Sequence, residues 1–348
     1  MIEYRCFRND DPPRLADAWR AADLGPCALQ PMTSAWLEAA VFSKPYFDRE
    51  GLIVALEDGR AVGFAHAGFG PDAEGVAIDY GTGTTMLVVV TPHEERAAIG
   101  ASLLARTEDY LRQRGARTIL GGASPDVGGF YLGLYGGSEL PGILASSPGM
   151  QGVFRQAGYT EAERISVLRR SVAGFRPPVN RLQMAIRRST TLRVIDEPAR
   201  RNWWEAATTT GIALRRYELW NDSQNLLGSA SFWDMQPLSS AWGLTAWGLL
   251  RVDIEGTRRR EGLANYMVAE ALHDLSQDHY AEAWCWVHWL LHTTPERRRI
   301  LQEYLADVRR DPATAPLSLR LRHECEPHGD PGAAVRDHLA GLAAVTAK

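Results

Sequence analysis

Apolar positions in the first half of the chain follow two spacings in turn. Short apolar or alternating runs predict strands, and apolar residues three or four positions apart predict helices with one buried face. The expected strands are residues 2–7, 52–56, 61–69, 85–90, 117–122 and 164–172, and the expected helices are residues 13–23, 95–116 and 150–159. Asp58-Gly59, between two of the apolar runs, predicts a tight hairpin.

The second half repeats this order after residues 173–185, where a glycine, paired prolines and polar residues predict a linker. The expected strands are residues 192–196, 211–220, 225–235 and 247–255, the expected helices are residues 198–208 and 256–275, and the apolar run 283–290 is a further strand candidate. The order strand, helix, hairpin, strand, helix therefore occurs twice. We expect one domain at 1–172, a linker at 173–185, a second domain at 186–290 and a divergent tail at 291–348.

Composition fits two ordinary globular domains, since 348 residues exceed the usual size of one. The chain is 45% hydrophobic and 23% charged, with a formal net charge of -4, so it has no overall positive charge for binding nucleic acid. No apolar run reaches the roughly 18 residues that a membrane helix needs. The four cysteines are scattered, as in reducing compartments. We expect a cytoplasmic protein without a metal site.

In each half, a predicted strand runs through a short turn into a predicted helix. The turn of the second half is Arg259-Arg260-Glu261-Gly262-Leu263-Ala264, and its counterpart in the first half is Glu95-Arg96-Ala97-Ala98-Ile99-Gly100. The second turn matches the Q/R-x-x-G-x-G/A element of the Gcn5-related N-acetyltransferase (GNAT) superfamily, which the chain resembles. The tandem arrangement resembles that of mycothiol-synthase-type proteins. The resemblance implies α/β (α+β) domains, each with a mixed, mostly antiparallel, twisted sheet flanked by helices.

The resemblance also implies that such a turn holds acetyl-CoA or another acyl-CoA. The first amides of a helix have no intrahelical acceptor and carry partial positive charge, so they suit a pyrophosphate. Small residues let the phosphates approach the backbone. The candidate cofactor-binding residues are Arg258, Arg259, Arg260, Glu261, Gly262, Leu263 and Ala264 in the second half and Arg96, Ala97, Ala98, Ile99, Gly100 and Ala101 in the first.

Both halves depart from the family pattern. In the first turn only Gly100 matches, because Glu95 stands at the Gln/Arg position and Ala98 at the first glycine position. Phe154 stands where the family commonly has a tyrosine that protonates the coenzyme thiolate. The second half lacks two final strands, so we expect an incomplete second domain. Its tail is either a divergent C-terminus or the product of a frameshift near residue 280.

Candidates for the catalytic base and the acceptor contacts follow from position. Asp253 and Glu255 lie near the end of the strand before the second turn, on one face, and are candidate bases; the alternative is that they pair with Arg258 to Arg260. Tyr131, Tyr135 and Glu139 belong to a segment rich in glycine and aromatic residues, 127–142, which either closes over an acceptor or packs over the core.

The resemblance implies an acyl-CoA-dependent N-acyltransferase that moves an acetyl group from acetyl-CoA to the amine of a small molecule. The alternative is a non-catalytic GNAT-fold binding or regulatory protein that has lost catalytic residues. The absence of a tyrosine at Phe154 favours this alternative, and the turn from Arg259 to Ala264 favours the enzyme. The candidate assembly is a homodimer.

Overall fold

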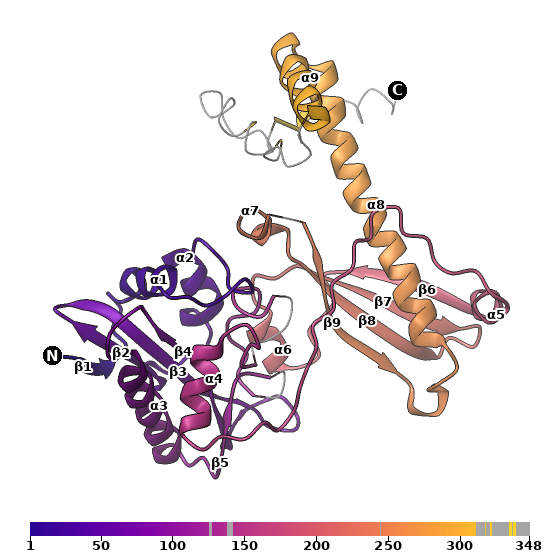
Figure 1. Ribbon diagram of the computed structural model, residues 1–348. Helices are drawn as coiled ribbons and strands as arrows, with labels where there is room; N and C mark the ends of the chain where they lie inside the picture. Colours follow the sequence, from indigo (N-terminus) through magenta and orange to yellow (C-terminus); the bar gives the residue numbers. More distant parts are fainter. Residues whose placement is uncertain are drawn as a thin grey trace. The chain divides into compact units, whose positions relative to one another are not determined.

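The computed structural model describes residues 1–124, 127–137, 142–243 and 245–310, together with residues 317, 321, 334, 335, 337 and 338. At residues 240, 277–285 and 308 only the backbone is described. The chain divides into two compact units. The first contains Met1–Arg170 and Asn180–Met267, and the second contains Ser171–Val179 and Val268–Lys348. Two β-sheets belong to the first unit (Figure 1).

The first sheet has five strands in the order β1-β2-β3-β4-β5. All neighbours are antiparallel except β4 and β5, which are parallel. The mixed, mostly antiparallel sheet predicted from sequence is therefore present. Its strands are β1 (Glu3–Cys6), β2 (Leu52–Glu57), β3 (Arg60–Pro71), β4 (Ile78–Val90) and β5 (Thr118–Gly121).

The β2–β3 hairpin is closed by Asp58 and Gly59, which have φ angles of 48° and 77°. Positive φ at both central residues is what a two-residue hairpin turn requires, and Asp-Gly adopts it readily. Strands β2, β3 and β4 contain long runs of buried residues because helices cover both faces of the sheet.

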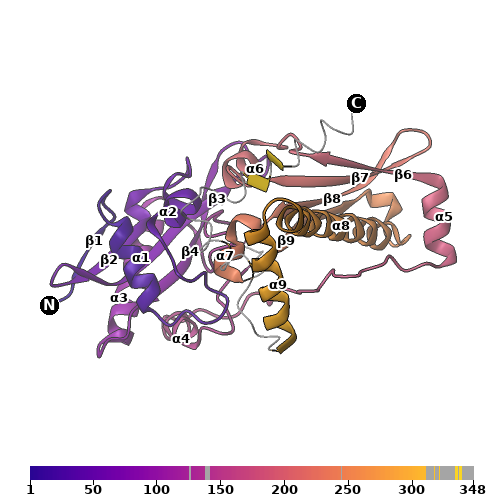
Figure 2. The ribbon, with the colours of Figure 1, turned by 90° about the horizontal axis from the view of Figure 1, so that it is seen from above.

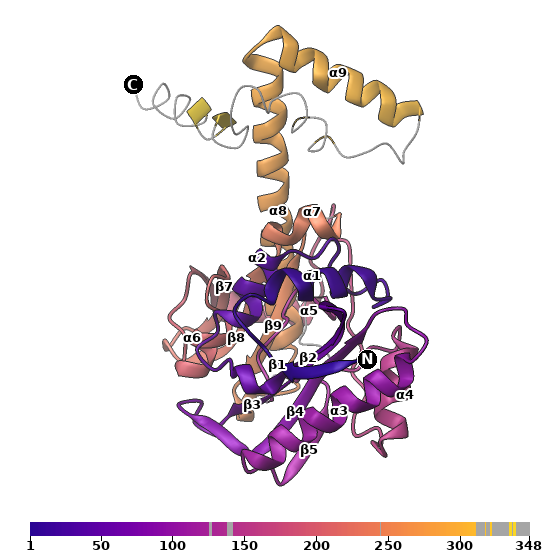
Figure 3. The ribbon, with the colours of Figure 1, turned by 90° about the vertical axis from the view of Figure 1, so that its left-hand side faces the viewer.

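Helices α1 (Pro12–Ala21) and α2 (Ser34–Leu37) lie on one side of the first sheet, and α3 (Arg96–Gln113) and α4 (Pro148–Gln156) lie on the other (Figures 1 and 3). α1 begins with two prolines, whose fixed φ suits the first helical turn. Its apolar stripe buries Leu15 and Trp19 almost completely. A π-helical turn, η1 (Glu38–Phe42), and a 3₁₀ turn, η2 (Arg49–Gly51), connect α2 to β2.

The second sheet has four antiparallel strands in the order β6-β7-β8-β9. These are β6 (Thr190–Asp196), β7 (Leu214–Asn221), β8 (Leu226–Asp234) and β9 (Trp247–Ile254). Helix α5 (Arg181–Ser189) precedes β6 and lies at one end of the sheet (Figure 2). The remaining elements are α6 (Trp203–Thr208), η3 (Gln236–Leu238), α7 (Ser239–Trp242), η4 (Gly256–Arg258), α8 (Leu263–His292) and α9 (Pro295–Arg310).

Side chains from the second sheet and its connections join the core of the first. Leu214, Trp233, Met235 and Leu238 belong to the same buried cluster as Trp19 and its neighbours. The Nζ atom of Lys44 also donates to the carbonyl oxygen of Thr208, at 2.9 Å. Residues of both sheets therefore share one buried cluster.

Three expectations about secondary structure were wrong. Residues 164–172 form no strand: Ile165 and Leu168 are 65% and 90% exposed, and alternation in sequence cannot supply a partner strand. Residues 283–290 lie within α8, because an apolar run fits a buried helix as well as a strand and no glycine or proline interrupts residues 263–294. The last part of the expected linker, 181–185, belongs to α5, which Asn180 caps by accepting from Gln183 N–H.

The second half of the chain differs from the first after its turn. The helix after the first turn, α3, spans 18 residues and leads to β5. The helix after the second turn, α8, spans 30 residues. In the described part of the chain no strand follows β9. Among the described helices, none has both the length and the apolar character needed to cross a membrane.

Candidate functional site

The second turn connects β9 to α8 through residues 255–262. Arg260 and Gly262 have positive φ angles, 68° and 82°. The first helical backbone bond of α8 runs from Tyr266 N–H to the carbonyl oxygen of Gly262, at 3.0 Å. Helix geometry therefore leaves the amides of Leu263 and Ala264 without an intrahelical acceptor, at the end of the helix with partial positive charge.

The backbone conformation favours glycine at position 262. Its φ of 82° lies in the left-handed region that favours glycine. A Cβ atom built on it would also lie 2.9 Å from Cδ2 of Leu182, on α5, so the leucine side chain would have to move. The backbone thus explains the glycine predicted from the family motif.

Arginines surround this turn. Arg258 forms an ion pair with Glu261, with 2.8 Å between Nη2 and Oε2, so its charge is compensated locally. Arg259 Nε donates to the carbonyl oxygen of Ile254 at 3.4 Å, and both Arg259 and Arg260 are exposed. Among the described residues no carboxylate pairs with these two guanidinium groups, so the turn is positively charged.

The two candidate bases have different surroundings. Asp253, on β9, is bonded to Arg251 and has a second arginine, Arg201, 3.9 Å away. Glu255 follows the strand and accepts a hydrogen bond from Thr257 Oγ1 at 3.0 Å. Both carboxylates are exposed. The alternative expected these carboxylates to pair with Arg258 to Arg260; among the described residues Asp253 pairs with Arg251 and Arg201 instead.

The first turn is packed more tightly. α3 begins at Arg96, and the exposed Glu95 donates its backbone N–H to His93 Nδ1 at 2.9 Å. Ile99 and Gly100 are buried, whereas Ala97, Ala98 and Ala101 are exposed. A Cβ atom on Gly100 would lie 2.8 Å from Cγ2 of Val153, so this glycine lets α4 approach α3.

α4 also fills the space where β4 and β5 separate. The two strands pair only between Thr82–Thr85 and Thr118–Gly121. Farther along β4, the N–H of Val88 donates to Sδ of Met150 at 3.4 Å. Phe154 is 2% exposed, and a Cβ on Gly121 would lie 2.8 Å from its ring. The residue at the expected tyrosine position is therefore a packing residue of the core.

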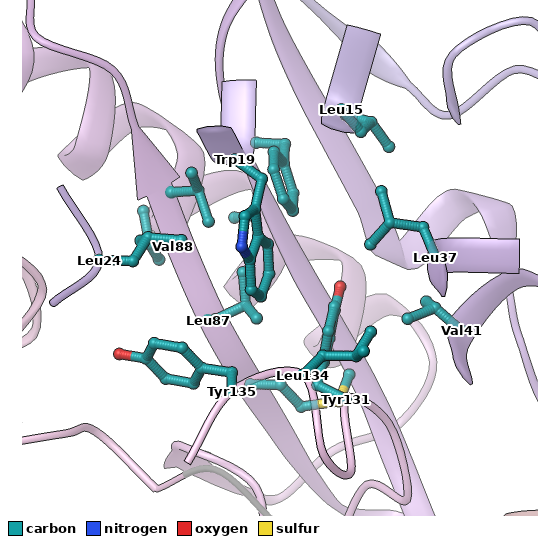
Figure 4. Packing of buried hydrophobic residues seen from close by; sticks show 14 of the residues in the cluster. Leu15, Trp19, Leu24, Leu37, Val41, Leu87, Val88, Tyr131, Leu134 and Tyr135 are labelled. Carbon is teal, nitrogen blue, oxygen red and sulfur yellow. The ribbon is translucent and has the colours of Figure 1, made fainter. Parts of the chain in front are cut away.

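Two of the three residues expected to contact an acceptor lie in the core of the first sheet. Tyr131 and Tyr135 are each 1% exposed, and both pack against Trp19, with ring centroids 6.1 Å apart in each pair (Figure 4). The Tyr131 hydroxyl bonds to His66 Nδ1 at 2.9 Å. Glu139 lies outside the described residues.

Sequence reasoning missed a large hollow beside β3, with a volume of about 940 Å³. Many of its lining residues are aromatic, and Phe42, Tyr46 and Phe47 come from one short segment. This density of aromatic residues within six positions of the sequence is the signal that could have indicated the hollow. In the described part of the chain, no three His, Cys, Asp or Glu side chains are grouped to hold a metal ion.

Comparison with known proteins identifies the first half. Residues 19–128 match the model of the acetyltransferase (GNAT) family. A mycothiol acetyltransferase from Cellulomonas flavigena is 33% identical over 115 residues, which are 31% of this chain and 33% of that protein. The match thus spans about a third of that relative's length.

Solved structures give the fold. A GCN5-related glucosamine N-acetyltransferase region of a fungal multi-domain GH3 β-N-acetylglucosaminidase aligns with a TM-score of 0.54 and 17% identity, over 80% of this chain and 34% of that one. A tandem GNAT protein from the clavulanic acid biosynthesis pathway aligns with a TM-score of 0.48 and 15% identity, over 80% and 86%. The chain therefore has a GNAT fold, and its residues 19–128 match the GNAT acetyltransferase family.

Proposed function

We propose that this chain is an acyl-CoA-dependent N-acyltransferase that transfers an acetyl group from acetyl-CoA to the amine of a small molecule. The family match of residues 19–128 and the likeness to a mycothiol acetyltransferase support the acetyltransferase activity. The observation that carries the proposal is the second turn. Here the first helix amides lack intrahelical acceptors, a glycine has a positive φ, and two arginines have no carboxylate partner among the described residues.

The second turn has the features that a pyrophosphate requires. The amides at the start of α8 are donors without intrahelical acceptors, and the helix dipole adds partial positive charge. Arg259 and Arg260 supply two further charges that no carboxylate among the described residues compensates. We therefore assign the coenzyme phosphates to residues 259–264, with Arg258 held in place by Glu261.

The first turn is the poorer coenzyme site. Ile99 and Gly100 are buried against α4, and Met150 already accepts the amide of Val88 where β4 and β5 separate. An acyl-CoA held there would have to displace α4. We therefore propose that the first domain supports the fold, while the second turn binds the coenzyme.

Glu255 is the better of the two candidate bases. In the proposed reaction the amine nitrogen attacks the thioester carbonyl, the C–S bond breaks, the coenzyme leaves as a thiolate, and the amine proton passes to a base. Arginines on both sides of Asp253 hold its carboxylate in ion pairs. Among the described residues, Glu255 accepts a side-chain hydrogen bond from the Thr257 hydroxyl and forms no ion pair that would have to break before it takes a proton.

Calorimetric titration with acetyl-CoA tests this assignment. We expect the wild type to bind, and we expect Gly262→Val and the double variant Arg259→Glu/Arg260→Glu to lose at least about tenfold in affinity because phosphate contacts are removed. Arg60→Glu/Arg169→Glu, which reverses two exposed arginines outside the turn, is the charge-matched control and should bind as the wild type does. Absence of binding to the wild type at millimolar acetyl-CoA would exclude the proposed function.

A second candidate is a GNAT-fold protein that binds the coenzyme without catalysis. The buried Phe154, at the position of the expected acid, favours it. Release of free coenzyme thiol from acetyl-CoA in the presence of a panel of small amines separates the two candidates. Binding without any amine-dependent thiol release would favour the non-catalytic protein, and amine-dependent release that Glu255→Gln lowers would favour the enzyme.

A further inference from the structure

The hollow of about 940 Å³ lies beside the first sheet, next to the first residue of β2, where β3 continues without β2 as a partner. β2 pairs with β3 only as far as Leu52 and His66. Ala67, Gly68 and Phe69 of β3 extend beyond this point and line the hollow. The segment between α2 and β2 forms the opposite wall, so the hollow replaces the missing continuation of β2.

Its walls are aromatic and hold one another in place. Phe42 and Phe47 pack edge to face, with ring centroids 5.4 Å apart, and Phe69 and Tyr80 do the same at 5.0 Å. Trp203 contributes a further ring, 6.4 Å from that of Tyr46. Such mutually packed rings keep their positions before a ligand enters.

The charged residues of the lining are Glu38, Asp48 and Arg49. Asp48 accepts from Arg114 at 2.7 Å and from the Tyr110 hydroxyl at 3.0 Å. Arg49 donates to the side-chain oxygen of Asn9 at 3.2 Å.

For the exposed Glu38, no ion pair or side-chain hydrogen bond is found among the described residues. The lining therefore carries one net negative charge, and Arg114 does not change this balance because it also pairs with Glu50.

We propose that this hollow binds a small organic cation, an ammonium group attached to an aromatic or branched apolar body. Ring faces attract cations through their quadrupoles. The volume lies in the range of small-molecule sites. None of residues 258–264 lines the hollow, so this site is separate from the proposed coenzyme turn.

Titration calorimetry without coenzyme tests the proposal, with 2-phenylethylamine and its neutral analogue 2-phenylethanol as probes. The two molecules share a ring and differ in charge. We expect the amine to bind about tenfold more tightly than the alcohol, in line with one or two cation–ring contacts. Tyr80→Ser, which changes a half-exposed side chain, should weaken the amine severalfold, and Glu38→Gln should reduce its advantage over the alcohol.

Glu94→Gln, an exposed carboxylate outside the hollow, is the matched control and should leave both affinities unchanged. Equal affinities for amine and alcohol, or no binding of the amine at millimolar concentration, would overturn the proposal. Amine binding that neither Tyr80→Ser nor Glu38→Gln changes would place the amine elsewhere and would overturn it too. Because no coenzyme is present, these outcomes do not depend on whether the chain transfers acyl groups.

Discussion

The Nδ1 atom of His66 lies 2.9 Å from the hydroxyl oxygen of Tyr131, inside the core of the first sheet. The imidazole packs against the ring of Phe130 with centroids 4.6 Å apart, and among the described residues no hydrogen-bond partner is found for its Nε2 atom. Burial lowers the pKa of His66 to about 3. The folded protein therefore keeps this histidine neutral over most of the acidic range.

This neutral histidine predicts a loss of stability in acid. As the pH falls from about 6.5 toward 3, the unfolded chain takes up a proton at His66 that the folded chain does not. The free energy of unfolding should fall by about 1.4 kcal/mol per pH unit from this group. In urea unfolding between pH 4 and 7, His66→Gln should reduce that slope. Tyr131→Phe keeps the histidine and should therefore keep the pH slope of the wild type. Equal slopes for His66→Gln and the wild type would contradict the prediction.

Lys44 predicts a dependence of the same sign in alkali, where stability rises with pH. Burial lowers its pKa to about 8, while an unfolded lysine has a pKa of about 10.4. Between these values the unfolded chain holds a proton that the folded chain has released, so stability should rise by about 1.4 kcal/mol per pH unit from this group. Urea unfolding of wild type and Lys44→Met at pH 7.5 and 9.5 should show the rise in the wild type and a smaller one in the variant. A variant with an equal or larger rise would contradict this assignment.

Packing at Gly100 predicts a compensating pair of substitutions. Gly100→Ala places a methyl group about 2.8 Å from Val153 and should cost about 1–3 kcal/mol through overpacking. Adding Val153→Ala removes the clash, so thermal unfolding of the double variant should show less loss than the sum of the two single variants. Strict additivity would indicate that the two helices do not meet at this glycine.

Asp11 and its neighbour Asp10 form a matched test of burial. Asp11 is fully buried and accepts two bonds from Arg5 at 2.7 Å, whereas Asp10 is exposed and pairs with Arg14. Burial alone would raise the pKa of Asp11, but the hydrogen bonds from Arg5 and from Arg8 N–H lower it overall. Asp11→Asn should therefore cost about 3–5 kcal/mol at neutral pH.

Asp10→Asn should cost far less than Asp11→Asn, because exposed ion pairs contribute little. The contribution of Asp11 is present above the pKa of an unfolded aspartate and is lost as the pH falls through its lower folded value. Chemical unfolding of both variants at pH 7 and pH 3 checks the two statements. Similar losses for both variants would show that burial of Asp11 is not decisive.

Local features of the fold could be predicted from sequence because they depend on neighbouring residues. Asp58-Gly59 specifies its turn through its own φ angles, and the apolar run 85–90 is long enough to mark a central strand. The failure at 164–172 has a different cause, since a strand exists only where another strand accepts its hydrogen bonds. The strand prediction for residues 283–290 failed because a continuous apolar run fits both the period of a helix and that of a strand.

In the candidate site, too, local features could be predicted from sequence and contacts between distant residues could not. The glycine and arginines of the second turn follow from a local motif, and the structure explains Gly262 by its φ angle and by Leu182. The contact between Met150 and Val88 joins residues 62 positions apart, so no motif could indicate it. The hollow beside β3 likewise combines segments from residues 7 to 203.

The exposed segment 161–170 has a consequence for limited proteolysis. It contains Arg164 and Arg169, and every side chain in it is exposed, so trypsin under native conditions should cut here early. The core of the first unit includes residues from both sides of that cut, among them Trp19 and Trp233. The two fragments should therefore elute together in gel filtration and separate only in denaturant, as a noncovalent pair that no longer needs its peptide connection.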